Sequence, residues 1–282
     1  MTRLVFTLLF LVNALNSLNA YAAEQECDAA ALKVIADYLN VKDFYLHDFE
    51  TNAGVIVSAA CKAAPQDPNI TLAAVGYSAA DKKTLQSTAN QESDTDNEKE
   101  LIVAMLDNTS KHILSIYKST MYEDAVVEVY RDSLRLDTAA YQLAPKVRAF
   151  GLRFDSGARG ASCPDAWQRD DLQLFVRNGA KLRPVFAAPM SQSLAKKGCA
   201  NAGASMETLV EEASLTIKVL KSKTNGYADL MLSALISTDG SDPVAQTIKP
   251  RVEHEVMHYD GEKYVTNKKD APWWLGTNWA LQ

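Results

Sequence analysis

The sequence predicts a mainly β protein built from antiparallel hairpins, with one helix near its N-terminus. Short segments rich in apolar residues recur along most of the chain and are separated by turn residues, which is typical of strands in hairpins. Turn signals such as Asn178-Gly179, Asn225-Gly226 and Asp260-Gly261 separate these segments, and such dipeptides are strong signals for a tight hairpin. Two architectures fit this pattern, a sandwich of two sheets and a small propeller-like array of sheets.

The first predicted element is a helix over residues 28–39. Leu32, Ile35 and Leu39 recur at helical spacing and would share one face. Asp28 stands where a side chain can accept a hydrogen bond from the first free backbone N–H groups. We therefore expect one helix that begins at Asp28 and has a single apolar face.

The remaining elements are predicted to be strands. Residues 86–100 are polar and acidic and contain no large apolar side chain, so they are predicted to form a loop. We expect one β-rich domain over residues 23–282, with a subdivision allowed near this loop. The predicted strands are 55–57, 72–77, 101–106, 113–117, 125–130, 147–154, 171–176, 182–187, 215–220, 230–236, 252–259 and 263–265.

The N-terminus has the pattern of a cleavable signal peptide. A positive charge at Arg3 is followed by the apolar run 4–12 and by Ala20-Tyr21-Ala22, which predicts cleavage near Ala22. The apolar run is too short to span a bilayer, and the acidic residues before Cys27 do not resemble a lipidation site. We expect a periplasmic or secreted protein without a membrane anchor.

Composition restricts the partners of the protein. Hydrophobic residues make up 47% and charged residues 23% of the chain, and its net charge is −6. An acidic chain without a cluster of Lys and Arg is a poor match for nucleic acid. No glycine-rich phosphate loop or nucleophile elbow occurs in the sequence, so we expect no cofactor. The partner is predicted to be a protein or another envelope component.

Four cysteines remain after the predicted cleavage: Cys27, Cys61, Cys163 and Cys199. An even number of cysteines in an exported chain favours disulfides over a metal site. Three pairings are open. The sequential one, Cys27 with Cys61 and Cys163 with Cys199, is our prediction.

Residues 254–258 match the HExxH motif of zinc peptidases. On a helix, His254 and His258 would share one face and bind one zinc ion while Glu255 activates a water molecule. Gly261 extends the match towards the metzincin pattern, but Tyr264 stands where that pattern needs its third histidine. A zinc-dependent metallohydrolase is therefore the alternative function.

The surroundings of this motif favour a strand. Residues 252–259 alternate between two sets of side chains, and Asp260-Gly261 ends the segment as a hairpin turn would. In a strand, residues four apart are about 13 Å apart at about 3.3 Å per residue. Two ligands of one zinc ion, each about 2.1 Å from the metal, cannot bridge that distance.

Three of the four tryptophans lie within seven residues near the C-terminus, at Trp273, Trp274 and Trp279. Aromatic clusters bind protein partners or sugars because they offer a large contact area at a small entropy cost. The other interpretation is a tail that folds back and closes the core. We name these residues as the predicted binding residues.

Two stretches, 135–154 and 171–186, resemble exported bacterial proteins of uncharacterised function. The resemblance covers the middle half of the chain and implies a periplasmic, β-rich protein without implying an activity. The sequence thus predicts a non-catalytic binding or interaction module, of which an immunity or inhibitor protein is one example.

Overall fold

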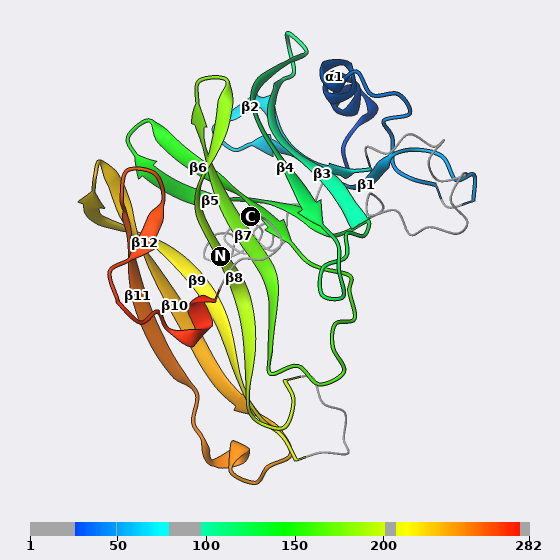
Figure 1. The fold of residues 1–282 in the computed structure, drawn as a ribbon. Helices are drawn as coiled ribbons and strands as arrows, with labels where there is room; N and C mark the ends of the chain where they lie inside the picture. The colour runs from blue at the N-terminus through cyan, green and yellow to red at the C-terminus, as the bar shows by residue number, and fades with distance from the viewer. Residues whose placement is uncertain (1–25, 49, 79–96, 201–206, 277–282) are drawn as a thin grey trace, which may run out of the picture.

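The computed structural model describes residues 26–48, 50–78, 97–200 and 207–276 (Figure 1). The predicted signal peptide and Trp279 lie outside these ranges. The elements, in chain order, are α1 (Ala29–Leu39), β1 (Ile56–Ala64), β2 (Asp67–Tyr77), β3 (Glu98–Asp107), β4 (His112–Tyr122), β5 (Leu134–Ala144), β6 (Val147–Phe154), β7 (Ala166–Asn178), β8 (Lys181–Lys197), β9 (Leu209–Thr224), β10 (Tyr227–Asp239), η2 (Ala245–Thr247), β11 (Arg251–Tyr259), β12 (Tyr264–Thr266) and η3 (Trp273–Leu275).

The predicted fold class is confirmed, because 59% of the described residues are in strands and one α-helix precedes these strands. The twelve strands of this part of the chain all belong to one mixed sheet. Neighbouring strands pair antiparallel except at one place, where β4 meets β8 in parallel through Ile116 and Lys181. A second branch leaves the main path at β8 and runs through β7 and β6 to β5.

This branch folds over the rest of the sheet and creates layers. β5 contacts β1 and β2 in one direction and β9 and β10 in the other. The layers enclose two apolar clusters, one between β1–β4 and β5–β7 and one between β7–β8 and β9–β12. The packing therefore corresponds to the sandwich expectation, although hydrogen bonds join the layers into one sheet.

The helix covers the outer face of β1–β4 (Figure 1). Its beginning is as predicted, since the Ala31 N–H donates to the Asp28 carboxylate at 2.6 Å. Leu32 and Ile35 are buried against the sheet. With a helix on one side and β5–β7 on the other, β2 and β3 have continuous buried runs instead of alternating ones.

The predicted strand over residues 125–130 is wrong. This segment has no regular structure, because side chains instead of a neighbouring strand bind its backbone. The N–H groups of Val126 and Val127 donate to Asp124, each at 2.8 Å. The Val129 N–H donates to the Glu123 carboxylate at 2.7 Å. β5, which follows this segment, was not predicted.

The hairpin turns follow the turn signals in the sequence. Thr224 pairs with Tyr227, so Asn225-Gly226 is a two-residue turn, and both of its residues have positive φ as a type I′ turn requires. In the β7–β8 hairpin, Asn178 pairs with Lys181, so the turn consists of Gly179 and Ala180. This turn lies one residue later than the predicted one.

Candidate functional site

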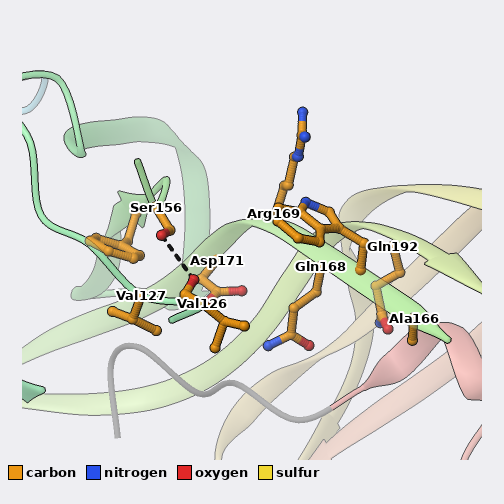
Figure 2. Close-up of a pocket in the computed structure, with 10 residues that line it drawn as sticks. Val126, Val127, Ser156, Ala166, Gln168, Arg169, Asp171 and Gln192 are labelled. Carbon is orange, nitrogen blue, oxygen red and sulfur yellow. Dashed lines mark hydrogen bonds between the residues drawn. The ribbon is translucent and has the colours of Figure 1, made fainter. Parts of the chain in front are cut away.

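A pocket of about 350 Å³ lies where the start of β7 meets the segment after β4 (Figure 2). Four parts of the chain contribute to it: the irregular segment after β4, the end of β6, the start of β7 and the middle of β8. The lining residues are Val126, Val127, Phe154, Ser156, Ala166, Trp167, Gln168, Arg169, Asp171 and Gln192.

The lining of the pocket is largely apolar. Phe154 and Val127 are 2% and 7% exposed, so they belong to the core as well as to the pocket wall. Val126 lies at the entrance and is 50% exposed. Trp167 is half-buried, and the Arg169 guanidinium lies over its ring at 5.4 Å from the ring centre. Asp171 and Gln192 add buried polar groups to the wall, at 5% and 8% exposure. A largely apolar lining with a few polar groups is typical of a binding pocket.

Hydrogen bonds fix two walls of the pocket relative to each other. The Ser156 hydroxyl donates to the Val126 carbonyl at 2.9 Å (Figure 2). The same hydroxyl oxygen accepts from the Glu128 N–H at 2.9 Å. Ser156 thus joins the end of β6 to the segment after β4. Because hydrogen bonds connect these two walls, the pocket is preformed.

The third wall is connected to the C-terminal part of the chain. Gln192 is 8% exposed, and its side-chain amide donates to the Trp274 carbonyl. Gly276, two residues after Trp274, also lies close to Gln192: a Cβ built on Gly276 would be 2.6 Å from the Gln192 amide nitrogen. The short helix η3 is therefore positioned directly beside the pocket.

The structure describes two of the three predicted binding tryptophans, Trp273 and Trp274. Trp274 is 0% exposed and packs in the apolar cluster between β7–β8 and β9–β12. Its indole N–H donates to the Glu253 carboxylate at 2.8 Å. Trp273 is half-buried against the same cluster, with the Lys196 ammonium 5.9 Å from its ring centre. Trp274 thus closes the core, and a partner cannot reach it from the surface.

The HExxH segment forms strand β11, so His254 and His258 do not have the helical spacing that the zinc motif needs. Glu255 is 4% exposed and lies on the opposite face of the strand, where it accepts a hydrogen bond from Thr266 and pairs with Lys268. His254 Nδ1 lies 2.9 Å from the Ser233 hydroxyl oxygen. The three residues therefore cannot act together as the motif requires.

His258 belongs to a polar group under the β9–β10 turn. Its Nδ1 lies 3.2 Å from both the Asp229 carboxylate and the Thr224 hydroxyl. Burial raises the pKa of Asp229, but hydrogen bonds from Ser222, Thr224 and His258 outweigh burial and hold that pKa below its ordinary value. This group ties β11 to the neighbouring turn.

The two disulfides have the predicted pairing. Cys27 is bonded to Cys61, with 4.7 Å between their Cα atoms, and Cys163 to Cys199, with 4.8 Å. The first joins the start of α1 to β1. The second joins the β6–β7 connection to the end of β8, next to the pocket.

Comparisons with known proteins assign no family to this chain, because it matches no family model, no curated protein and no solved structure. In the described part of the chain, none of the helices has the length and apolar character of a membrane span.

Sequence reasoning missed the pocket. Its residues come from four separated segments, and none of them forms a motif in the sequence. One signal was present: Trp167 is the single tryptophan outside the C-terminal region. A large aromatic side chain among polar residues is a common feature of binding surfaces, but its companions in the pocket depend on the fold.

Proposed function

We propose that this protein is a non-catalytic binding module of an oxidising compartment outside the cytoplasm. We propose further that the pocket around Phe154 and Trp167 receives an apolar side chain of a partner protein. The two disulfides support the choice of compartment, and so does the signal-peptide pattern of the sequence.

The observation that carries this proposal is the preformed apolar pocket with an exposed entrance. Its volume of about 350 Å³ lies within the usual range of binding pockets, which is roughly 300–1,000 Å³. Hydrogen bonds of Ser156 already hold the walls in place, so binding would require little additional ordering of the protein.

A second hollow, of about 570 Å³, fits an apolar group less well. Both partners of the Lys99–Glu123 ion pair line it, with 2.7 Å between their charged groups, and so do Glu128 and Arg131. An apolar group placed there would displace water from charged side chains, which costs free energy. The pocket beside Trp167 has fewer charged lining residues, namely Arg169 and Asp171.

The probe for the test is 8-anilinonaphthalene-1-sulfonate (ANS), a dye that fluoresces in apolar sites. We expect saturable binding to the native protein with one dominant site. Val126→Glu places a negative charge at the entrance, where it repels the sulfonate of the dye, and should raise the Kd at least about tenfold, which corresponds to about 1.4 kcal/mol. Val126 is 50% exposed, so this change should leave the fold intact.

The matched control is Val252→Glu. Val252 is 56% exposed and lies on β11, outside the residues that line the pocket. The Kd of this control variant for ANS should equal that of the wild type. Native protein that binds no ANS, or an equal loss of affinity in both variants, would refute the pocket as the binding site.

A further inference from the structure

The wall of the pocket includes both ends of one irregular connection. Residues 155–165 join β6 to β7 without regular secondary structure. Ser156 lines the pocket at the start of this connection, and Ala166 and Trp167 line it just after the end. The conformation of residues 155–165, here called the wall loop, therefore determines the shape of the pocket.

Noncovalent contacts hold the first half of the wall loop. The Gly157 N–H donates to the Glu128 carbonyl at 2.9 Å. Gly160 has φ of +67° and lies so close to the Trp167 ring that a Cβ there would overlap the ring atoms. The loop thus folds back over Trp167 and keeps the indole in its place in the pocket wall.

A disulfide holds the second half. Cys163 is bonded to Cys199, which follows β8. Beside this bond, the Ala195 N–H donates to the Asp165 carbonyl and the Ala200 N–H to the Pro164 carbonyl, each at 2.8 Å. Cys163 is an exposed residue, whereas Cys199 is 3% exposed, so a reductant approaches the bond from the side of Cys163.

We propose that the Cys163–Cys199 disulfide is a redox-sensitive clamp on the pocket. In the oxidised protein the bond holds the wall loop against Trp167. Reduction releases the loop, and the pocket then has its binding shape for only part of the time. Because this inference concerns the regulation of the proposed binding site, it rests on the proposed function.

The reductant belongs to the class of dithiols. One of its thiolates attacks the Sγ of Cys163, the more exposed of the two residues. The S–S bond breaks, and the electron pair passes to Cys199, which takes up a proton. The second thiol of the reductant then displaces Cys163 as a thiol and closes the disulfide of the reductant. Two electrons and two protons are transferred to the protein, and the dithiol becomes a disulfide.

The second disulfide of the chain provides a matched control. Cys27–Cys61 closes a loop of nearly the same length, with a sequence separation of 34 against 36. It also joins one buried cysteine to a more exposed one. It lies near α1, whereas the end of β8 lies at the opposite end of the molecule (Figure 1), and neither Cys27 nor Cys61 lines the pocket.

The experiment compares Cys163→Ala/Cys199→Ala with Cys27→Ala/Cys61→Ala and the wild type, using ANS titration under native conditions. If the released loop holds the binding shape for about a tenth of the time, the Kd of the first variant rises about tenfold. The control variant should remain within twofold of the wild type. Equal affinities in all three proteins, or an equal loss in both variants, overturn the clamp.

Hydrogen exchange of the wall loop separates this inference from the proposed function. Amide exchange in residues 155–167 should accelerate in Cys163→Ala/Cys199→Ala and not in the control, whether or not ANS binds. If no protein binds ANS and the exchange differs, the proposed function fails, and the result supports only the part of the inference that the disulfide holds the wall loop. Unchanged exchange in residues 155–167 overturns the clamp.

Dithiothreitol treatment of the wild type keeps the test decisive if the first variant does not fold. Alkylation and mass spectrometry identify the disulfide that has been reduced. Protein reduced at Cys163–Cys199 should show the same rise in the Kd for ANS. Reduced protein with the affinity of the oxidised protein would contradict the proposal.

Discussion

At the scale of single residues, Gly160 and Gly179 have nearly the same backbone conformation in different surroundings. Their φ values are +67° and +63°. Within 4 Å of a Cβ built at Gly179 there is no other atom, whereas a Cβ at Gly160 would meet the Trp167 ring. Substitution by alanine therefore separates the cost of the backbone conformation from the cost of the contact.

Gly179→Ala should lose about 1–2 kcal/mol of unfolding free energy. This is the usual cost of a left-handed backbone conformation for a residue that has a Cβ. Gly160→Ala should lose about 1–3 kcal/mol more, since the ring and the wall loop have to move apart. Urea unfolding measures both losses. Equal losses in the two variants would mean that Gly160 does not hold the loop against Trp167.

Trp273 and Trp274 are adjacent in sequence but differ in environment. Trp274 is 0% exposed. Trp274→Ala should therefore lose about 3–5 kcal/mol of unfolding free energy, the usual cost of deleting a buried aromatic side chain. Trp273→Ala, which removes a half-buried ring, should lose less than about 2 kcal/mol. Urea unfolding of both variants tests this order, and the reverse order would contradict the placement of η3.

The sequence alone could not distinguish these two tryptophans. Hydrophobic pattern and spacing identify an aromatic cluster, but burial depends on which strands the C-terminal segment reaches. Glu253 of β11 supplies the hydrogen-bond acceptor for Trp274, and no local signal links the two residues. From the sequence, the tryptophan cluster could either bind a partner or close the core. The structure supports closure of the core for Trp274.

At the scale of elements, local signals predicted the hairpins and the helix well. Capping by Asp28 and the turn at Asn225-Gly226 depend on neighbouring residues, and both occur as expected. Prediction failed for residues 125–130, because the groups that bind their backbone include Ser156, which is distant in sequence. The parallel contact of β4 with β8 is likewise a property of the whole fold.

Charged side chains connect β5, β6 and the start of β7. Arg153 of β6 pairs with Asp137 of β5 at 2.9 Å and also with Asp170 of β7. Arg135 pairs with Asp155 and Asp170, each at 2.8 Å. Burial raises the pKa of Asp137, but the Ala139 N–H, Arg153 and Tyr141 outweigh burial and hold the pKa of this carboxyl below its usual value.

The lowered pKa of Asp137 fixes the pH dependence of its contribution to stability. The unfolded chain takes up the proton first, at a pKa of about 3.9. The contribution is therefore complete above that pH and is lost as the pH falls through the lower pKa of the folded protein. Asp137→Asn should be about 1–3 kcal/mol less stable than the wild type at pH 7, and this difference should shrink at pH 3.

Urea unfolding at the two pH values measures this difference. Asp270→Asn is the control, because Asp270 is exposed and lies outside the network; it should match the wild type at both pH values. A stability difference for Asp137→Asn that is as large at pH 3 as at pH 7 would show that charge does not cause it.

At the scale of the whole molecule, one hydrogen-bonded sheet and two disulfides hold separate layers together. The disulfides lie at opposite ends of the layered structure, one beside α1 and one beside the pocket. Each closes a loop of similar length in the unfolded chain, with sequence separations of 34 and 36. The chain-entropy account of disulfides then predicts nearly equal stabilisation by each bond, although only one of them holds the wall loop whose ends line the pocket.

Each double alanine variant, Cys27→Ala/Cys61→Ala and Cys163→Ala/Cys199→Ala, should lose about 4 kcal/mol of unfolding free energy. Urea unfolding under identical conditions measures both losses. A gap of more than about 2 kcal/mol between them would mean that contacts in the folded state, rather than restriction of the unfolded chain, dominate one of the bonds. Equal stability losses together with unequal ANS affinities would separate the structural role that both disulfides share from the control of the pocket that we assign to Cys163–Cys199 alone.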